Sequence, residues 1–192
     1  DAAVDRFVPV SHATQDAHTI RTVFRAGQTP VEVEQLLIYT NGSPRYHLVW
    51  NITNRGSQVY NDLRFVHGGD VSYYGDDFGY GYWGAGSGMV YVASSTPGHP
   101  GVMGLAGQTG YPAASYYENH FQLVRDACKT GALPSSARAD EHDLSYALLW
   151  TRPSLAVGGS WTVAAYEWWS LSESLFLDAP AGQEGDPGDS ID

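Results

Sequence analysis

The chain is poor in basic residues, cysteine and long apolar runs. Its 192 residues include 10 Lys and Arg against 21 Asp and Glu, which gives a formal net charge of −11. Binding to nucleic acid requires a basic surface, and so does attraction to an anionic membrane, so neither partner fits this charge balance. No apolar run approaches the roughly 18 residues of a membrane-inserted helix. The single cysteine, Cys128, excludes an intramolecular disulfide.

Several motifs of enzymes and metal sites are also missing. The sequence has no GxSxG nucleophile motif and no P-loop, and its seven histidines form neither HxH nor HExxH. Gly79, Gly81 and Gly84 match the string GxGxxG, but the residues after them predict a strand, whereas a dinucleotide site requires a helix there. The sequence therefore carries none of these local signatures.

Glycine and aromatic residues are abundant, with 22 Gly, 13 Tyr and 6 Trp. This composition favours strands and loops over helices. The turn signal Asn41-Gly42-Ser43-Pro44 separates two alternating segments and predicts a hairpin between residues 31–40 and 45–53. Turn spacing along the chain predicts a mostly β fold, a large antiparallel β-sandwich of about ten strands. We expect one domain over residues 1–178.

One segment departs from the β pattern. Between Tyr117 and Cys128, apolar residues recur at spacings of three and four, which is typical of one face of a helix. Ser115 is a suitable residue to start this helix, and Gly131 is a suitable residue to end it. We therefore expect one short helix or helical insertion over residues 115–129.

The segment 179–192 has almost nothing to bury, and it carries acids without a single base. Low hydrophobicity combined with glycine and proline predicts an acidic Gly/Pro linker or a disordered tail. A linker implies that the domain is a module of a longer protein, so flanking domains are expected partners.

The segment 161–169 is rich in tryptophan. Strand alternation places Trp161 and Glu167 on one face, and it places Tyr166 and Trp168 on the other. Because both faces carry rings, we expect a central strand that is largely buried on both sides.

The segment from His67 to Gly84 reads HGGDVSYYGDDFGYGYWG and combines glycines, aromatic rings and acids. Glycine permits tight turns, aromatic rings provide flat apolar faces, and carboxylates accept hydrogen bonds. This mixture is typical of a loop that binds a polar ligand with hydrophobic faces, such as a sugar. The alternative is that the rings close one end of the core. The candidate ligand-binding residues are Tyr73, Tyr74, Tyr80, Tyr82 and Trp83.

Asp70, Asp76 and Asp77 are the candidate metal ligands of this segment. Calcium takes roughly six to eight oxygen ligands from carboxylates and loop carbonyls, so calcium is the cofactor that fits them. Their spacing does not match an EF-hand. As an alternative, the adjacent Asp76 and Asp77 suit an Asx turn that braces the loop.

His67 adjoins the same loop and is the candidate catalytic residue. A histidine beside Tyr73 or Tyr74 suits acid and base roles in a lyase or hydrolase. The alternative is a hydrogen-bonded loop histidine without a catalytic role.

The order of the segments resembles a known class of module. NITNRGSQVYNDLRF is followed by HGGDVSYYGDDFGYGYW and GMVYV, and later by HDLSYALLW and LAVGGSWTVAAYEWW. This succession covers residues 51–169 and resembles the supersandwich-like β-sandwich modules of large secreted or surface proteins of bacteria. Related folds occur in carbohydrate-active proteins. The resemblance implies a secreted or cell-surface location and an accessory or adhesive role, and it assigns no catalytic residue.

Three functions follow from these patterns. The first is a noncatalytic extracellular binding module for a carbohydrate or another cell-surface ligand. The second is a polysaccharide lyase or hydrolase that uses His67 and a neighbouring tyrosine. The third is a structural spacer or assembly domain of a surface protein. The fold alone does not choose among them.

Overall fold

The computed structural model describes residues 7–72 and 75–171 and shows a mostly β chain with one short helix, as the sequence predicts. The prediction for residues 179–192 lies outside the described residues. The strands are β1 (Phe7–Thr14), β2 (Thr19–Ala26), β3 (Val31–Tyr39), β4 (Arg45–Asn54), β5 (Tyr60–Asp70), β6 (Phe78–Gly84), β7 (Met89–Ser94), β8 (Val102–Gly107), β9 (Ser115–His120), β10 (His142–Leu155) and β11 (Ser160–Ser170), and the helix is α1 (Phe121–Thr130).

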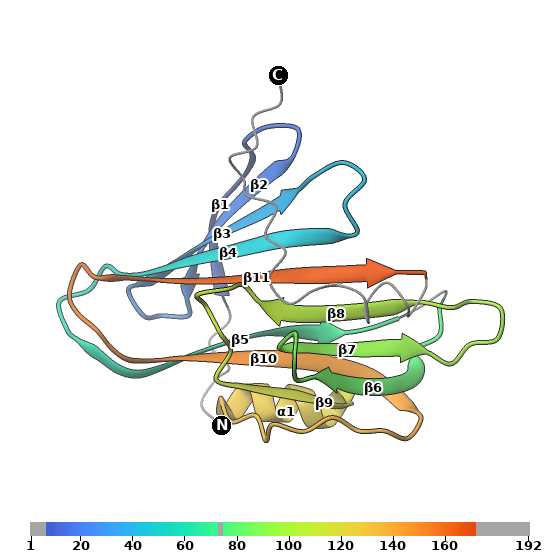
Figure 1. Cartoon of the computed structure of the whole chain (residues 1–192). Coiled ribbons are helices and arrows are strands. Elements are labelled where there is room, and N and C mark those ends of the chain that lie inside the picture. The colour runs from blue at the N-terminus through green and yellow to red at the C-terminus, as the bar shows by residue number, and fades with distance from the viewer. Residues whose placement is uncertain (1–6, 73–74, 172–192) are drawn as a thin grey trace.

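The eleven strands form one connected sheet in the order β1-β2-β3-β4-β11-β8-β7-β6-β10-β5, with β9 beside β10. The link between β6 and β10 consists only of the pairs made by His142 and Asp143, and the sheet folds over at this link. As a result, β5, β10 and β9 form a second layer that faces β4, β11, β8 and β7 (Figure 1). This two-layer arrangement is compatible with the expected β-sandwich.

The main core lies between these two layers. The ring of Trp50 on β4 lies 5.1 Å from Phe65 of β5 and 6.1 Å from Trp150 of β10, measured between ring centroids. Along β10, Ala147 and Leu149 alternate with the core residues, so their side chains lie on the opposite face of the strand. There they pack in a hydrophobic cluster together with α1. The helix therefore covers the outer side of the second layer (Figure 1).

Two predictions about individual strands are confirmed. Strands β3 and β4 form the expected antiparallel hairpin across the turn at Gly42. Strand β11 is central, because it pairs with β4 on one side and with β8 on the other. Trp161 packs in the main core, while Trp168 packs in a separate cluster on the opposite face.

The predicted start of the helix is wrong. Residues Ser115–His120 form β9, which pairs with β10, and α1 begins at Phe121. The aromatic run in β9 completes the hydrogen bonding of β10, and this long-range pairing outweighs the local helical pattern. The predicted end is confirmed, because Gly131 closes the helix in the left-handed conformation. No helix in the described part of the chain is long and apolar enough to cross a membrane.

Asn54, at the end of β4, connects two turns. Its side chain is fully buried, and its amide N–H groups donate to the carbonyls of Gln58, Leu155 and Ala156 at 2.7, 3.1 and 3.1 Å. Its side-chain oxygen accepts the Gly56 N–H at 2.9 Å. One side chain thus joins the β4–β5 turn to the β10–β11 turn.

Candidate functional site

The segment from His67 to Gly84, in its described part, reaches the surface where β5, β6 and β10 meet. The Leu144 N–H donates to the Asp77 carbonyl at 2.7 Å, and the Val71 N–H donates to the Leu144 carbonyl at 3.1 Å. Phe78 of β6 pairs with Asp143 of β10. These contacts bring side chains from three strands to one surface. We call this surface the acid–aromatic edge, and it consists of Asp70, Asp77, Phe78, Tyr80 and Asp143.

The acid–aromatic edge concentrates negative charge. Burial raises the pKa of the Asp70 carboxyl, and the nearby charges of Asp143 and Asp77 raise it further. The imidazole Nε2 of His120 lies 3.5 Å from Oδ2 of Asp143. The other carboxylate oxygen of Asp143 is buried and has no hydrogen-bond partner among the described residues. This arrangement favours ligands that donate hydrogen bonds or carry positive charge.

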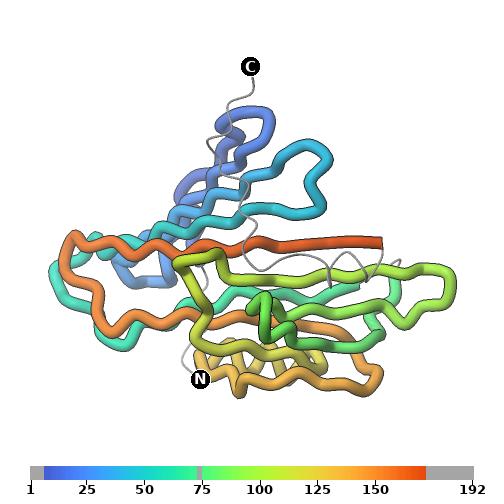
Figure 2. Tube along the Cα trace, in the orientation of Figure 1, coloured from blue at the N-terminus to red at the C-terminus, as the bar shows by residue number. Residues whose placement is uncertain are grey.

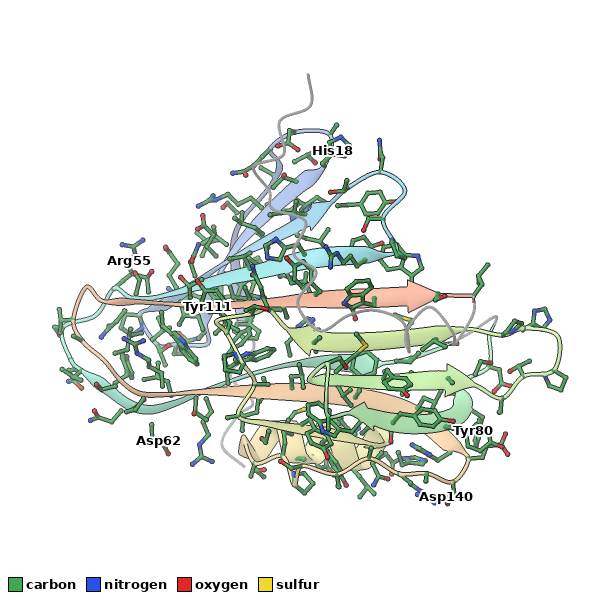
Figure 3. The ribbon with its side chains drawn as sticks, in the orientation of Figure 1. His18, Arg55, Asp62, Tyr80, Tyr111 and Asp140 are labelled. Carbon is green, nitrogen blue, oxygen red and sulfur yellow. The ribbon has the colours of Figure 1, made fainter. Side chains whose placement is uncertain are left out.

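Two aromatic side chains of the edge face solvent. Phe78 is 48% exposed and Tyr80 is 38% exposed, although large apolar rings are usually buried. Figure 3 shows Tyr80 at the periphery of the structure, on the same side as Asp140. The other two candidate tyrosines, Tyr73 and Tyr74, lie outside the described residues.

Tyr82 and Trp83 pack against other rings. Tyr82 stacks on Tyr91 with ring centroids 4.9 Å apart. Trp83 lies nearly parallel to Tyr116 at 3.7 Å, next to the main core. Their positions suit the alternative reading, in which the rings of this segment close the core.

Asp76 braces the loop. One carboxylate oxygen accepts the Phe78 N–H at 3.2 Å, and the other accepts the Thr96 hydroxyl at 2.8 Å. The hydrogen bonds from Thr96 and Phe78 lower the pKa of the Asp76 carboxyl. This geometry is that of an Asx turn. Over residues 7–72 and 75–171, no three His, Cys, Asp or Glu side chains are grouped closely enough to hold a metal ion.

His67 points between the two layers. Its ring centroid lies 4.6 Å from that of Trp50, and it pairs across the ladder with Leu148. Burial lowers the pKa of the imidazole to about 4, so the ring is neutral near pH 7. The side chain therefore contacts the core at the position where the sequence suggested an acid–base residue.

We expect acidification from about pH 7.5 to about pH 4.5 to cost about 2 kcal/mol of unfolding free energy through His67 alone. Its pKa is 6.5 in the unfolded chain and about 4 in the fold, so the unfolded chain gains most of a proton in this interval and the folded chain gains only a small fraction of one. The stability is fully present above the unfolded pKa and is lost as the pH falls towards the folded one. Urea unfolding of the wild type and of His67→Leu at both pH values measures the difference.

The leucine variant should lose about 2 kcal/mol less on acidification than the wild type. His18→Gln is the control, because His18 is exposed and its removal leaves His67 in place. An unchanged pH dependence in His67→Leu would contradict the prediction.

A buried acid–base pair lies behind β6. Glu118 is fully buried, and its Oε1 lies 2.7 Å from Nε2 of His142. Its Oε2 accepts the Arg138 N–H at 2.8 Å. Nδ1 of His142 donates to the Asp140 carbonyl at 2.6 Å. The carboxylate fills the space beside Gly81, where any Cβ atom would overlap it.

This pair has a structural role. Burial raises the pKa of the Glu118 carboxyl, because solvent cannot reach the charge. The pair ties the start of β10 to β9, and both of its side chains are buried. Local sequence patterns do not reveal this pair, because Glu118 lies within the expected helix and its partner His142 is far along the chain.

A cleft of about 360 Å³ lies beside β10 and the start of β11. Tyr111, Trp150, Arg152 and Trp161 contribute to its lining. Figure 3 shows Tyr111 well away from Tyr80, so this cleft is separate from the acid–aromatic edge. Local sequence patterns do not reveal the cleft, because its lining comes from three separate segments.

The sequence matches no family model, and it matches no curated protein. The resemblance to supersandwich-like modules therefore stays a prediction.

Proposed function

We propose that this chain is a noncatalytic extracellular module that binds carbohydrate at the acid–aromatic edge. The observation that carries the proposal is the pair of exposed rings, Phe78 and Tyr80, beside the carboxylates of Asp70, Asp77 and Asp143. Ring faces stack on the apolar face of a sugar, and carboxylates accept its hydroxyl hydrogens. The net charge of −11 favours a neutral or cationic ligand at this edge. Secretion or display on a cell surface is part of the proposal.

The lyase or hydrolase hypothesis receives less support from the geometry. His67 contacts Trp50 between the layers, and its lowered pKa makes it a weak base near pH 7. We therefore favour binding without turnover.

A glycan array probed with the purified chain tests the proposal, once with calcium and once with a chelator. We expect hits, and we expect the double variant Phe78→Ala, Tyr80→Ala to bind about tenfold more weakly, because stacking is lost. Phe7→Ala is the matched control, since Phe7 is an exposed ring on β1, which is the first strand in the sheet order. This control should bind as the wild type does.

The two array conditions also test calcium. Hits that require calcium would give a metal role to the carboxylates of Asp70 and Asp77, while hits in both conditions would support sugar binding without a metal. Blank arrays in both conditions would contradict the proposal and favour a spacer or assembly domain. Binding to the flanking domains of a longer protein would then be measured.

A further inference from the structure

We infer that the cleft beside β10 and β11 is a second binding site, and that its ligand is an acidic saccharide unit with a carboxylate group. None of the residues that line the cleft belongs to the acid–aromatic edge. The two sites share no residue, so each can be tested without the other.

The cleft has a fixed aromatic base. Trp150 of β10 and Trp161 of β11 come from facing layers, and both belong to the main core. The indole N–H of Trp150 donates to the Tyr111 carbonyl at 2.8 Å, which holds the turn before β9 against the base. The Tyr111 side chain is 36% exposed, so its ring is available for stacking.

Arg152 places a positive charge at the cleft. Its guanidinium is exposed, and its Nε donates to the Ser154 carbonyl at 3.4 Å. None of the ion pairs in the described part of the chain includes this arginine. Six other bases do pair with acids, namely Arg21, Arg55, Arg64, Arg125, Lys129 and Arg138. In a chain with about twice as many acids as bases, an arginine at a cleft that has no acidic partner among residues 7–72 and 75–171 is suited to an acidic ligand.

Three hydroxyl groups add polar partners. Thr151, Ser160 and Thr162 also line the cleft. The Thr162 hydroxyl donates to Asn51 at 2.9 Å, and that of Ser160 shares a hydrogen bond with Thr53 at 3.0 Å. Because each hydroxyl oxygen has two lone pairs, both retain capacity to accept from a ligand.

These features together select the ligand class. The planar guanidinium binds a carboxylate through two parallel hydrogen bonds. The tyrosine ring suits the apolar face of a sugar, and the hydroxyl groups suit its remaining oxygens. The volume of about 360 Å³ is at the small end of typical small-molecule sites, which suits a short saccharide.

Calorimetric titration of the full chain with a galacturonic acid trimer tests the inference, with the neutral galactose trimer as the matched ligand. We expect the acidic trimer to bind at least about tenfold more tightly, because the free energy of a hydrogen bond between charged groups corresponds to at least a tenfold change in affinity. Arg152→Gln should remove this preference. Arg25→Gln is the matched control, since Arg25 is also exposed, donates to a nearby carbonyl and makes no ion pair among the described residues.

Two further variants locate the binding. Tyr111→Ala should weaken binding of the acidic trimer, and circular dichroism should show that it remains folded, because the Trp150 bond uses the backbone of Tyr111. The Phe78→Ala, Tyr80→Ala variant should bind the acidic trimer as the wild type does. The inference is overturned if both trimers bind equally or neither binds, if Arg25→Gln matches Arg152→Gln, or if the edge variant loses binding.

Discussion

Gly81→Ala is expected to lower the free energy of unfolding by about 3–5 kcal/mol. The new methyl group would overlap the Glu118 carboxylate. The carboxylate cannot easily move away from this methyl group, because it is fully buried and is hydrogen-bonded to His142 and to the Arg138 N–H. The variant must therefore displace a buried, hydrogen-bonded charge.

Urea unfolding followed by circular dichroism measures this loss. Gly86→Ala is the matched control, since a Cβ atom there meets nothing within 4 Å, and its stability should stay within about 0.5 kcal/mol of the wild type. In a Glu118→Ala background, Gly81→Ala should cost less than about 1 kcal/mol, because the methyl group no longer meets a carboxylate. Strictly additive costs would contradict the assigned contact.

Asn54→Ala is expected to lower the free energy of unfolding by about 3 kcal/mol. The change removes the partner of three carbonyls and of the Gly56 N–H at a fully buried position. Buried polar groups that lose their partners are costly, because water does not replace the lost bonds. Thermal and urea unfolding both report the loss.

Asn61→Ala serves as the control for this variant. Asn61 is exposed on β5, so its truncation should change stability by less than about 0.5 kcal/mol. A cost below about 1 kcal/mol for Asn54→Ala would show that the connection between the two turns contributes little.

Local patterns account for the parts of the fold that the sequence predicted. The hairpin at Gly42 depends on neighbouring residues, and so does the helix end at Gly131. The start of the helix depends on a distant strand, since Ser115–His120 pairs with β10. The spacing of apolar residues within a short stretch of sequence carries no information about that pairing.

The same distinction holds for the surfaces. The Asx turn at Asp76 involves its near neighbour Phe78, so sequence reasoning could propose it. Asp143 reaches the acid–aromatic edge only because β10 pairs with β6. Arg152 and Tyr111 line the same cleft because the fold brings three separate segments together. Neither arrangement can be predicted from the local spacing of residues in the sequence.

The placement of β10 and β11 has a consequence for synthesis on the ribosome. These strands follow all the others in the described chain, yet each lies between two earlier strands (Figure 2). Until they emerge, β4 and β5 have unpaired edges, because the ladders Trp161 with Ile52 and Leu148 with His67 cannot form. Such long-range pairings fold slowly, and unpaired edges favour aggregation. We therefore expect the nascent chain to need protection by chaperones until β11 has been released.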